Sequence, residues 1–94
     1  MMRIIQYSSQ FKKDVELSKR RQKKIEKLKN IIEMLTNDIE LPASLRDHQL
    51  SGKFNKHREL HIEPDWLLIY SFPDSSLLRL ERLGTHSDLF RKGK

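Results

Sequence analysis

The sequence contains no cysteine among its 94 residues, so disulfide bonds and thiolate zinc sites are excluded. This absence favours a reducing, cytoplasmic compartment over secretion. Long hydrophobic runs are missing too: no apolar stretch approaches the ~20 residues of a membrane span, and the N-terminus has no signal-peptide core. We therefore expect no membrane partner. The three glycines stand apart from one another, which excludes a glycine-rich phosphate loop and a nucleophile elbow.

Negative charge is also scarce, because the chain has 13 Asp and Glu residues but 19 Lys and Arg residues, which gives a net charge of +6. The excess lies in one segment: residues 12–29 hold nine basic and three acidic residues, and nine minus three gives +6. Such a segment favours nucleic acid or an acidic protein as partner, since phosphates neutralised by Lys or Arg release counterions. A solvated helical face explains the same residues equally well.

The N-terminal half predicts a strand and then two helices. Residues 3–7 form a short strand pattern, and Ser8 or Ser9 can cap a helix over residues 10–21. A second apolar stripe recurs at spacings of three and four, typical of an amphipathic helix: Ile25, Leu28, Ile32, Leu35 and Ile39. We expect a helical hairpin with a turn near residues 20–23, although one long kinked helix also fits.

The C-terminal half predicts three strands, at about residues 54–62, 66–72 and 77–83. The first alternates polar and apolar residues, the second is continuously apolar, and turn-forming residues separate all three. A short helical turn follows Gly84. The order β-α-α-β-β-β predicts an α+β fold in a single domain over residues 1–94, with the helical hairpin on one face of a largely antiparallel sheet.

Four histidines are many for so short a chain. His48 lies in the loop before the residue 54–62 strand, His61 on that strand, and His86 just past the last strand. Because strand ends bring distant residues together, these imidazoles can meet the carboxylate of Asp65, and such a set is suited to acid–base hydrolysis. Incidental surface histidines are the plainer interpretation.

A metal site is the competing interpretation of the histidines. His57 and His61 are four residues apart, the spacing of zinc-binding pairs on a helix. On a strand they lie about 13 Å apart, too far to bind one ion. We therefore expect no metal, and the sequence indicates no cofactor.

Three motifs occur together in the chain: DH-x-L-x-G at residues 47–52, H-x-E-P-D-W at residues 61–66 and G-T-H-x-x-L-F at residues 84–90. Each is weak alone, but the combination resembles the YafQ-like branch of the RelE/ParE superfamily, toxins of bacterial type II toxin–antitoxin systems. The resemblance covers essentially the whole chain. The RelE-like fold that it implies, a small sheet with a helical hairpin on one face, agrees with the predicted order of elements.

The resemblance implies a metal-independent endoribonuclease, an mRNA interferase that cleaves messenger RNA in the ribosomal A site and inhibits translation. The matching active-site positions are His48, His61, Asp65, His86 and Phe90, with Trp66 beside them. His57 matches no such position. The implied partners are the ribosome with its mRNA and rRNA, and a cognate antitoxin of the ribbon-helix-helix, DinJ/RelB-like kind. A non-enzymatic ParE-like inhibitor and a catalytically dead RNA- or antitoxin-binding module are the alternatives.

Strand scission by the 2′-hydroxyl of RNA needs a base, an acid and positive charge at the phosphate. We expect His86 to be the general acid. Either Asp65 or His61 is expected to be the general base, and His48 a phosphate contact or an alternative base.

Two aromatic residues and the basic segment are expected to bind RNA. Phe90 and Trp66 are suited to stack a base or wall the site, although core packing explains Trp66 equally well. The basic helical face is expected to grip ribosomal RNA through Lys19, Arg20, Arg21, Lys23, Lys24 and Lys27.

Overall fold

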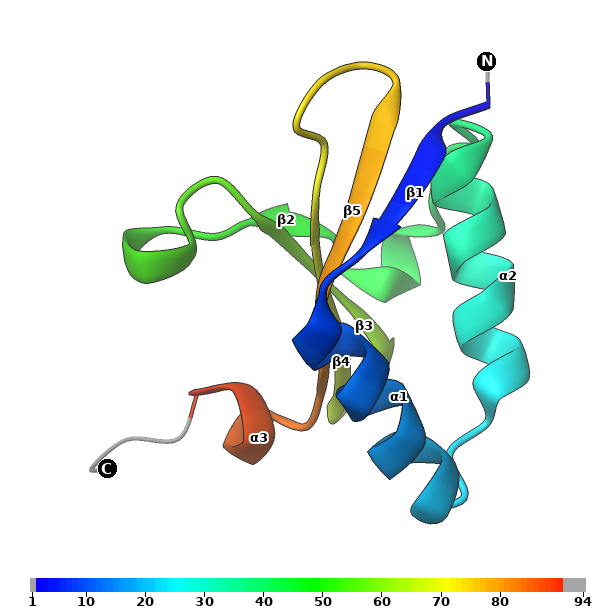
Figure 1. Ribbon diagram of the computed structural model, residues 1–94, viewed down its shortest axis with the longest axis vertical. Helices are drawn as coiled ribbons and strands as arrows, with labels where there is room; N and C mark the ends of the chain where they lie inside the picture. Colours follow the sequence, from blue (N-terminus) through cyan, green and yellow to red (C-terminus); the bar gives the residue numbers. More distant parts are fainter. Residues whose placement is uncertain (1, 91–94) are drawn as a thin grey trace.

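Two long helices pack on one face of a five-stranded sheet in the computed structural model, which describes residues 2–90 (Figure 1). Strand β1 (Ile4–Tyr7) leads into helix α1 (Ser9–Arg20). The Oγ of Ser8 caps α1 as expected, by accepting a backbone N–H of the first turn at 2.9 Å. Helix α2 (Ile25–Thr36) follows after a short turn.

The helical hairpin is confirmed, and the single kinked helix is wrong. Gln22, just past α1, adopts a left-handed conformation with a φ of 61°. A left-handed residue cannot continue a right-handed helix, so the chain changes direction here. Helix α2 then returns along the sheet (Figure 1).

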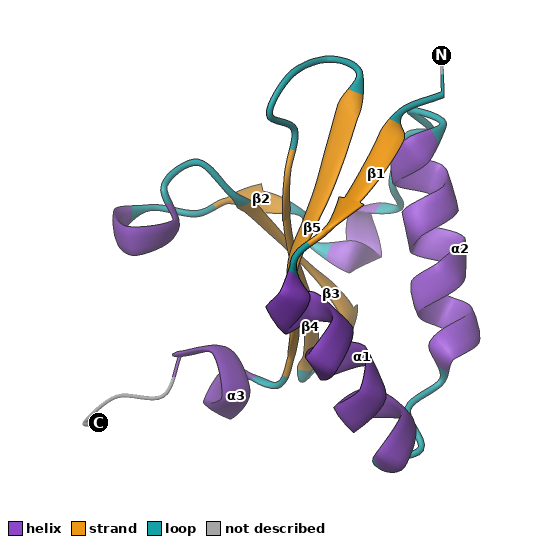
Figure 2. Ribbon diagram, in the orientation of Figure 1, coloured by secondary structure: helices purple, strands orange, loops and turns teal. Residues whose placement is uncertain are grey.

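The sheet has the order β1-β5-β4-β3-β2, where β2 is His48–Gln49, β3 is Arg58–Glu63, β4 is Trp66–Ser71 and β5 is Leu77–Gly84 (Figure 2). Neighbouring strands are antiparallel except β1 and β5, which are parallel. The central strand β4 is buried along its whole length, as its continuous apolar run predicts. The expected helical turn is α3 (His86–Phe90). The α+β architecture is thus confirmed.

Two details differ from expectation. The strand expected over residues 54–62 begins only at Arg58, because the chain first forms a 3₁₀ helix, Gly52–Phe54. The sequence also does not predict β2, because two residues are too few to show a period. Pairing with β3, where His48 lies opposite Glu59, forms this strand.

The main core lies between the sheet and the two long helices. It is built from Phe11, Leu28, Ile31, Leu35, Leu60, Ile62, Trp66, Leu68, Tyr70, Leu78, Leu80 and Leu83. The opposite face carries a smaller cluster of Leu67, Ile69 and Leu89, against which Leu50 and Phe54 pack. Within residues 2–90, short elements rather than a helical layer cover this second face, which we call the open face.

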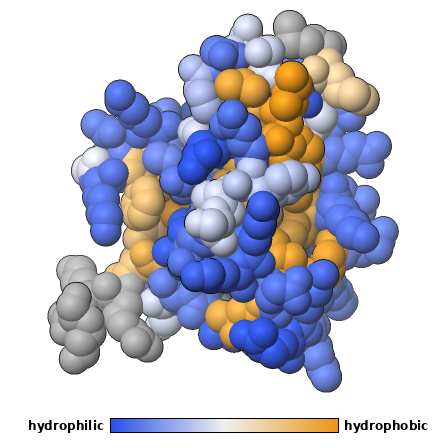
Figure 3. Space-filling view, viewed as in Figure 1, coloured by the Kyte–Doolittle hydropathy of each residue, from blue (hydrophilic) through white to orange (hydrophobic). Residues whose placement is uncertain are grey.

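Strand β1 forms one edge of the sheet and leaves apolar side chains exposed, Ile4 by 66% and Tyr7 by 49%. Figure 3 shows apolar surface in orange running among hydrophilic blue atoms on this side of the molecule. Among residues 2–90, no helix has the length and apolar character needed to cross a membrane.

Candidate active site

Three histidines form a row on the open face. The ring centroids of His48 and His61 are 6.2 Å apart, and those of His61 and His86 are 6.0 Å apart. His61 points to this face because its neighbours on β3, Leu60 and Ile62, point into the main core. The structure therefore brings together the three imidazoles that the sequence places in a loop, on a strand and past the last strand.

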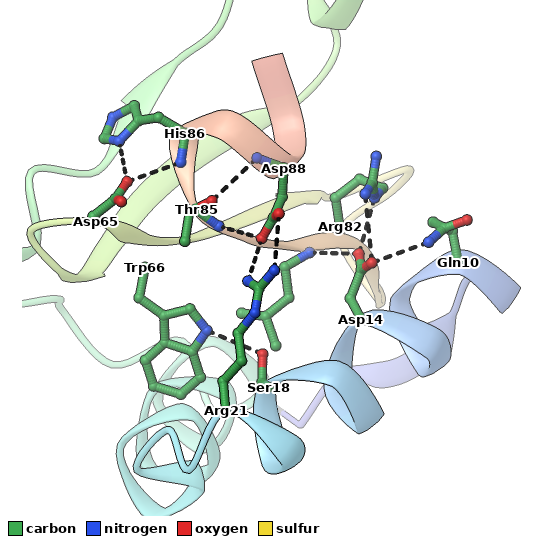
Figure 4. Close-up of polar contacts among 11 residues, drawn as sticks. Gln10, Asp14, Ser18, Arg21, Asp65, Trp66, Arg82, Thr85, His86 and Asp88 are labelled. Carbon is green, nitrogen blue, oxygen red and sulfur yellow. Dashed lines mark hydrogen bonds and ion pairs between the residues drawn. The ribbon is translucent and has the colours of Figure 1, made fainter. Parts of the chain in front are cut away.

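Asp65 lies in the turn between β3 and β4 and holds His86 in place. Its Oδ1 accepts the backbone N–H of His86 at 2.9 Å and lies 2.6 Å from the ring Nδ1 (Figure 4). These contacts, the backbone hydrogen bond first, hold the pKa of Asp65 below its ordinary value. A carboxylate only accepts hydrogen bonds, so His86 donates through Nδ1 and presents Nε2 to a ligand.

Helix α3, which carries His86, is fixed at its first turn by Asp88. The carboxylate of Asp88 accepts the backbone N–H of Thr85 at 3.0 Å, and the backbone N–H of Asp88 donates to the Thr85 hydroxyl at 3.1 Å. This reciprocal pattern is a capping box. Gly84 permits the close approach, because a Cβ there would lie 2.8 Å from an Asp88 carboxylate oxygen.

An arginine from the helical hairpin completes this anchor. The guanidinium of Arg21, just past α1, donates to both carboxylate oxygens of Asp88, at 2.7 and 3.3 Å (Figure 4). The hydrogen bond from Arg21, together with those from Thr85, lowers the pKa of Asp88 to about 2. Arg21 thus connects the hairpin to the helix that carries His86, rather than standing free for RNA.

A second anchor holds His48. Its Nδ1 lies 2.8 Å from the backbone carbonyl oxygen of Arg46, and its Nε2 lies 3.3 Å from the buried carboxylate of Glu59. Because a carbonyl oxygen only accepts, Nδ1 is the donor in the first contact. When His48 is protonated, its second contact becomes an ion pair. Both contacts orient the ring toward His61.

The loop that carries His48 is tied to the sheet through Asp47. This carboxylate accepts from Arg58 at 2.9 and 3.1 Å and from the hydroxyl of Tyr70. Burial first, and then the Asp47 carboxylate, raises the pKa of Tyr70 above its ordinary value, so Tyr70 is a neutral donor. The loop is therefore held by β3 and β4 together.

A hollow of about 450 Å³ opens beside the histidine row, and it is lined by Ser44, Leu45, Arg46, His61, Ile62, Glu63, Pro64 and His86. The Nδ1 of His61 is shielded from solvent and has no hydrogen-bond partner among the described residues. His61 can therefore reach a ligand only through Nε2. Phe90, at the end of α3, is 38% exposed and lies edge-on to Phe54 with ring centroids 6.1 Å apart.

Trp66 belongs to the main core, so the expectation that it stacks an RNA base is wrong. Its side chain is 0% exposed, and its indole N–H donates to the hydroxyl of Ser18 on α1 at 3.3 Å. Figure 4 shows the indole directed toward α1. The alternative of core packing explains this residue, because Trp66 faces the two helices together with Leu68 and Tyr70.

The basic face expected to grip RNA is partly occupied by ion pairs. Besides the pair of Arg21 with Asp88, Lys27 lies 3.1 Å from Glu63, and Lys19 lies 3.6 Å from Glu16. The other three expected contacts have no ion pair within residues 2–90: Arg20, Lys23 and Lys24. They lie at the end of α1 and in the turn to α2, which is the basic patch that remains for a polyanion.

His57 lies apart from the histidine row. Its Nε2 is 3.9 Å from a carboxylate oxygen of Glu81, and its ring lies edge-on to Phe54. Over the described part of the chain, no three His, Asp or Glu side chains are arranged to hold a metal ion.

Sequence reasoning misses the residues that hold the site. Only Asp88 carries a local signal, because Thr85 and Asp88 have the spacing of a capping box. The other anchors are long-range pairs without a sequence signature, such as Arg21 with Asp88 and Arg58 with Asp47. Another is the buried Asp14 of α1, which accepts from Arg82 of β5 at 2.9 Å (Figure 4).

Comparisons with known proteins agree with this architecture. The family described as "Bacterial toxin of type II toxin-antitoxin system, YafQ" matches residues 3–91. The chain is 47% identical to the mRNA interferase toxin YafQ of Escherichia coli strain K12 over 91 residues, which cover 96% of this chain and 98% of that protein.

Solved structures of relatives share the fold. The crystal structure of the E. coli DinJ–YafQ toxin–antitoxin complex matches with a TM-score of 0.87 at 46% identity, covering 96% of this chain and 99% of that one. A metal-bound toxin from Helicobacter pylori matches with a TM-score of 0.86 at 33% identity, covering 96% and 100%. Sequence and fold agree along nearly the whole length, and the chain belongs to the YafQ family of bacterial toxins of type II toxin–antitoxin systems.

Proposed function

We propose that this toxin is an endoribonuclease that cleaves messenger RNA in the ribosomal A site and thereby inhibits translation. The observation that carries the proposal is the row of three imidazoles in which Asp65 orients His86. The E. coli relative, named an mRNA interferase, supports it, because the identity of 47% extends over 96% of this chain. Imidazoles that exchange protons near neutral pH suit RNA cleavage by the strand's own 2′-hydroxyl.

His61 and His86 divide the proton transfers in this mechanism. The Nε2 of His61 removes the 2′-hydroxyl proton while the 2′-oxygen bonds to phosphorus. The Nε2 of His86 gives a proton to the 5′-oxygen while the bond from phosphorus to that oxygen breaks. Their ring centroids, 6.0 Å apart, allow both to serve one phosphodiester. The products are a 2′,3′-cyclic phosphate and a 5′-hydroxyl.

Asp65 orients the general acid rather than serving as the base. The carboxylate of Asp65 already accepts two contacts from His86, both at Oδ1. Those contacts lower its pKa and so weaken it as a base. Of the two candidate bases that the sequence leaves open, we therefore assign His61.

His48 and Arg46 supply charge at the phosphate. His48 stacks on His61, and Arg46 lines the same hollow, so a cation can stand beside the crowded phosphorus. Phe90 walls the site at the other end of α3, where its ring is partly exposed. None of these steps calls on a metal ion, and we propose that cleavage is metal-independent.

The ribosome and an antitoxin are the proposed partners, and the cytoplasm the proposed compartment. Arg20, Lys23 and Lys24 form a patch without ion-pair partners in the described chain, which suits contact with rRNA phosphates. The E. coli relative has been crystallised with DinJ in a toxin–antitoxin complex. We propose for this chain an antitoxin similar to DinJ, with the ribbon-helix-helix fold that the sequence resemblance implies.

The proposal is tested by following cleavage of a defined message on purified ribosomes, with growth arrest on expression as the cellular readout. His86→Ala removes a general acid and should slow cleavage by about 10²–10⁴-fold while relieving the arrest. Lys12→Gln, an exposed change on α1, is the control and should cleave normally. If His86→Ala cleaves as fast as wild type, the active site does not lie at the histidine row. If wild type arrests growth without cutting RNA, the chain is an inhibitor instead.

A further inference from the structure

A second hollow lies at the far end of the open face, where β3 and β5 begin and β4 ends. Its volume is about 500 Å³, close to the 450 Å³ of the hollow beside the histidine row. Its principal lining residues are Lys56, His57, Ser71, Phe72, Arg79 and Glu81. Neither the sequence motifs nor the proposed mechanism gives these residues a role.

A path of aromatic rings joins the two hollows. His57 directly precedes β3 and lies four residues before His61, a separation of about 13 Å along the extended chain. Phe54 lies edge-on to both His57 and Phe90, with ring centroids 5.7 and 6.1 Å apart. Phe90 belongs to the same helix as His86. A strand that leaves the histidine row across Phe90 and Phe54 therefore arrives at His57.

The charges in the second hollow suit a phosphate. Its one carboxylate, Glu81, is neutralised by the Nε of Arg79 at 2.7 Å. The terminal guanidinium nitrogens of Arg79 make no hydrogen bond to another residue in the described range 2–90, and the Lys56 ammonium forms no ion pair there. The Nδ1 of His57 is shielded from solvent and likewise lacks a partner among these residues. Donors thus outnumber acceptors.

An aromatic surface completes the recognition of a nucleotide. Phe72 lines the hollow and is 38% exposed, although a ring of this size is normally buried. The guanidinium of Arg3 lies over the ring, 4.3 Å from its centroid, so a base can stack only on the opposite side. Exposed aromatic rings beside cationic side chains are how proteins hold single-stranded nucleic acid, because each base has a face that stacks.

We propose that this second hollow binds a flanking nucleotide of the RNA strand that is cut at the histidine row. Arg79 and Lys56 contact its phosphate, and Phe72 stacks its base. The inference rests on the proposed nuclease function, for which the hollow positions the substrate and takes no part in proton transfer.

The double variant Lys56→Gln/Arg79→Gln tests the subsite by steady-state cleavage of ribosome-bound message. Losing charged contacts to a phosphate should raise KM about tenfold, with kcat within about twofold. The slope of log affinity against log salt concentration should become shallower by about one to two. Lys12→Gln is the matched control for lost charge and should leave KM unchanged. A message shortened by the flanking nucleotides should raise the KM of wild type but not that of the variant.

Photo-crosslinking separates failure of this inference from failure of the nuclease proposal. A thiouridine in the flanking position should crosslink to the peptide that contains Phe72 in wild type and in the inactive His86→Ala protein, since binding does not require cleavage. An unchanged KM together with no crosslink overturns the subsite while leaving the nuclease intact. Loss of antitoxin affinity with unchanged KM would identify the hollow as a protein contact and also overturn it.

Discussion

Helix α3 carries His86, and the carboxylate of Asp88 anchors it, so Asp88→Asn should weaken both the fold and the enzyme. Asparagine keeps a side-chain oxygen that can accept the Thr85 N–H, but it loses the charge that Arg21 binds through two hydrogen bonds. The substitution therefore removes the connection to the hairpin and leaves the capping box in place.

The magnitude follows from the pKa of Asp88, which falls from 3.8 to about 2 in the folded protein. At ~1.4 kcal/mol for each tenfold change in proton affinity, this difference corresponds to about 2.5 kcal/mol. Part of this difference belongs to the hydrogen bonds from Thr85, and the Arg21 side chain is 41% exposed, so the contribution of the ion pair falls to about 1 kcal/mol. A loss of that size lowers the Tm of a domain this small by about 4–8 °C.

The pH dependence has a definite sign. Because the pKa of Asp88 is depressed on folding, its stabilisation is present above about pH 4 and is lost as the pH falls through 2. Thermal unfolding should therefore show a gap between wild type and Asp88→Asn at pH 7 that closes toward pH 2. Lys27→Gln removes the ion pair of Lys27 with Glu63, which is held by a single contact. The difference in thermal stability from wild type should be smaller for Lys27→Gln than for Asp88→Asn.

Turnover is the second readout for Asp88→Asn, because a looser α3 displaces the general acid. Single-turnover cleavage should slow by about ten- to a hundredfold with little change in KM. The single variant Arg21→Lys keeps both charges of the pair and should lose less of the rate than Asp88→Asn. A variant that loses thermal stability yet cleaves at the wild-type rate would show that the anchor holds the fold alone. Equal stability at pH 7 would refute the ion-pair argument itself.

Three further predictions follow from the packing and the charges. Trp66→Phe should fold and cleave, since Trp66 faces the core and the change removes its hydrogen bond to Ser18 and only part of its buried ring, whereas Trp66→Ala should cost about 3–5 kcal/mol in denaturant unfolding. Gly84→Ala should lower Tm and turnover together, because the added Cβ meets the capping carboxylate. Changing Arg20, Lys23 and Lys24 to glutamine should weaken ribosome binding and flatten its salt slope by about two to three, with an unchanged cleavage position; an equal slope would mean that these side chains are only solvated.

The parts of the fold that could be predicted are those with a local period. The three-and-four spacing gives α2, the unbroken apolar run gives the central strand β4, and Ser8 gives the start of α1. The motifs locate His48, His61 and His86, and the topology then brings them into one row.

The rest depends on contacts between residues far apart in the chain. Trp66 illustrates the ambiguity, because an aromatic residue beside an active-site motif can face either the substrate or the core, and only the strand register decides. Arg21 looks like one more cation in a basic segment until α3 places Asp88 beside it. Strand β2 exists because Glu59 of β3 lies opposite His48, and two residues alone cannot show that.

The chemistry of the cleaved ends tests the central claim most directly. A ribosome-bound message should be cut by wild type in the presence of excess chelator, and mass spectrometry should find 2′,3′-cyclic phosphate or 3′-phosphate ends next to 5′-hydroxyl ends. His61→Ala and His86→Ala should each lose these products. A 3′-hydroxyl end, or activity that chelator abolishes and a divalent metal restores, would contradict cleavage by the 2′-hydroxyl at the histidine row.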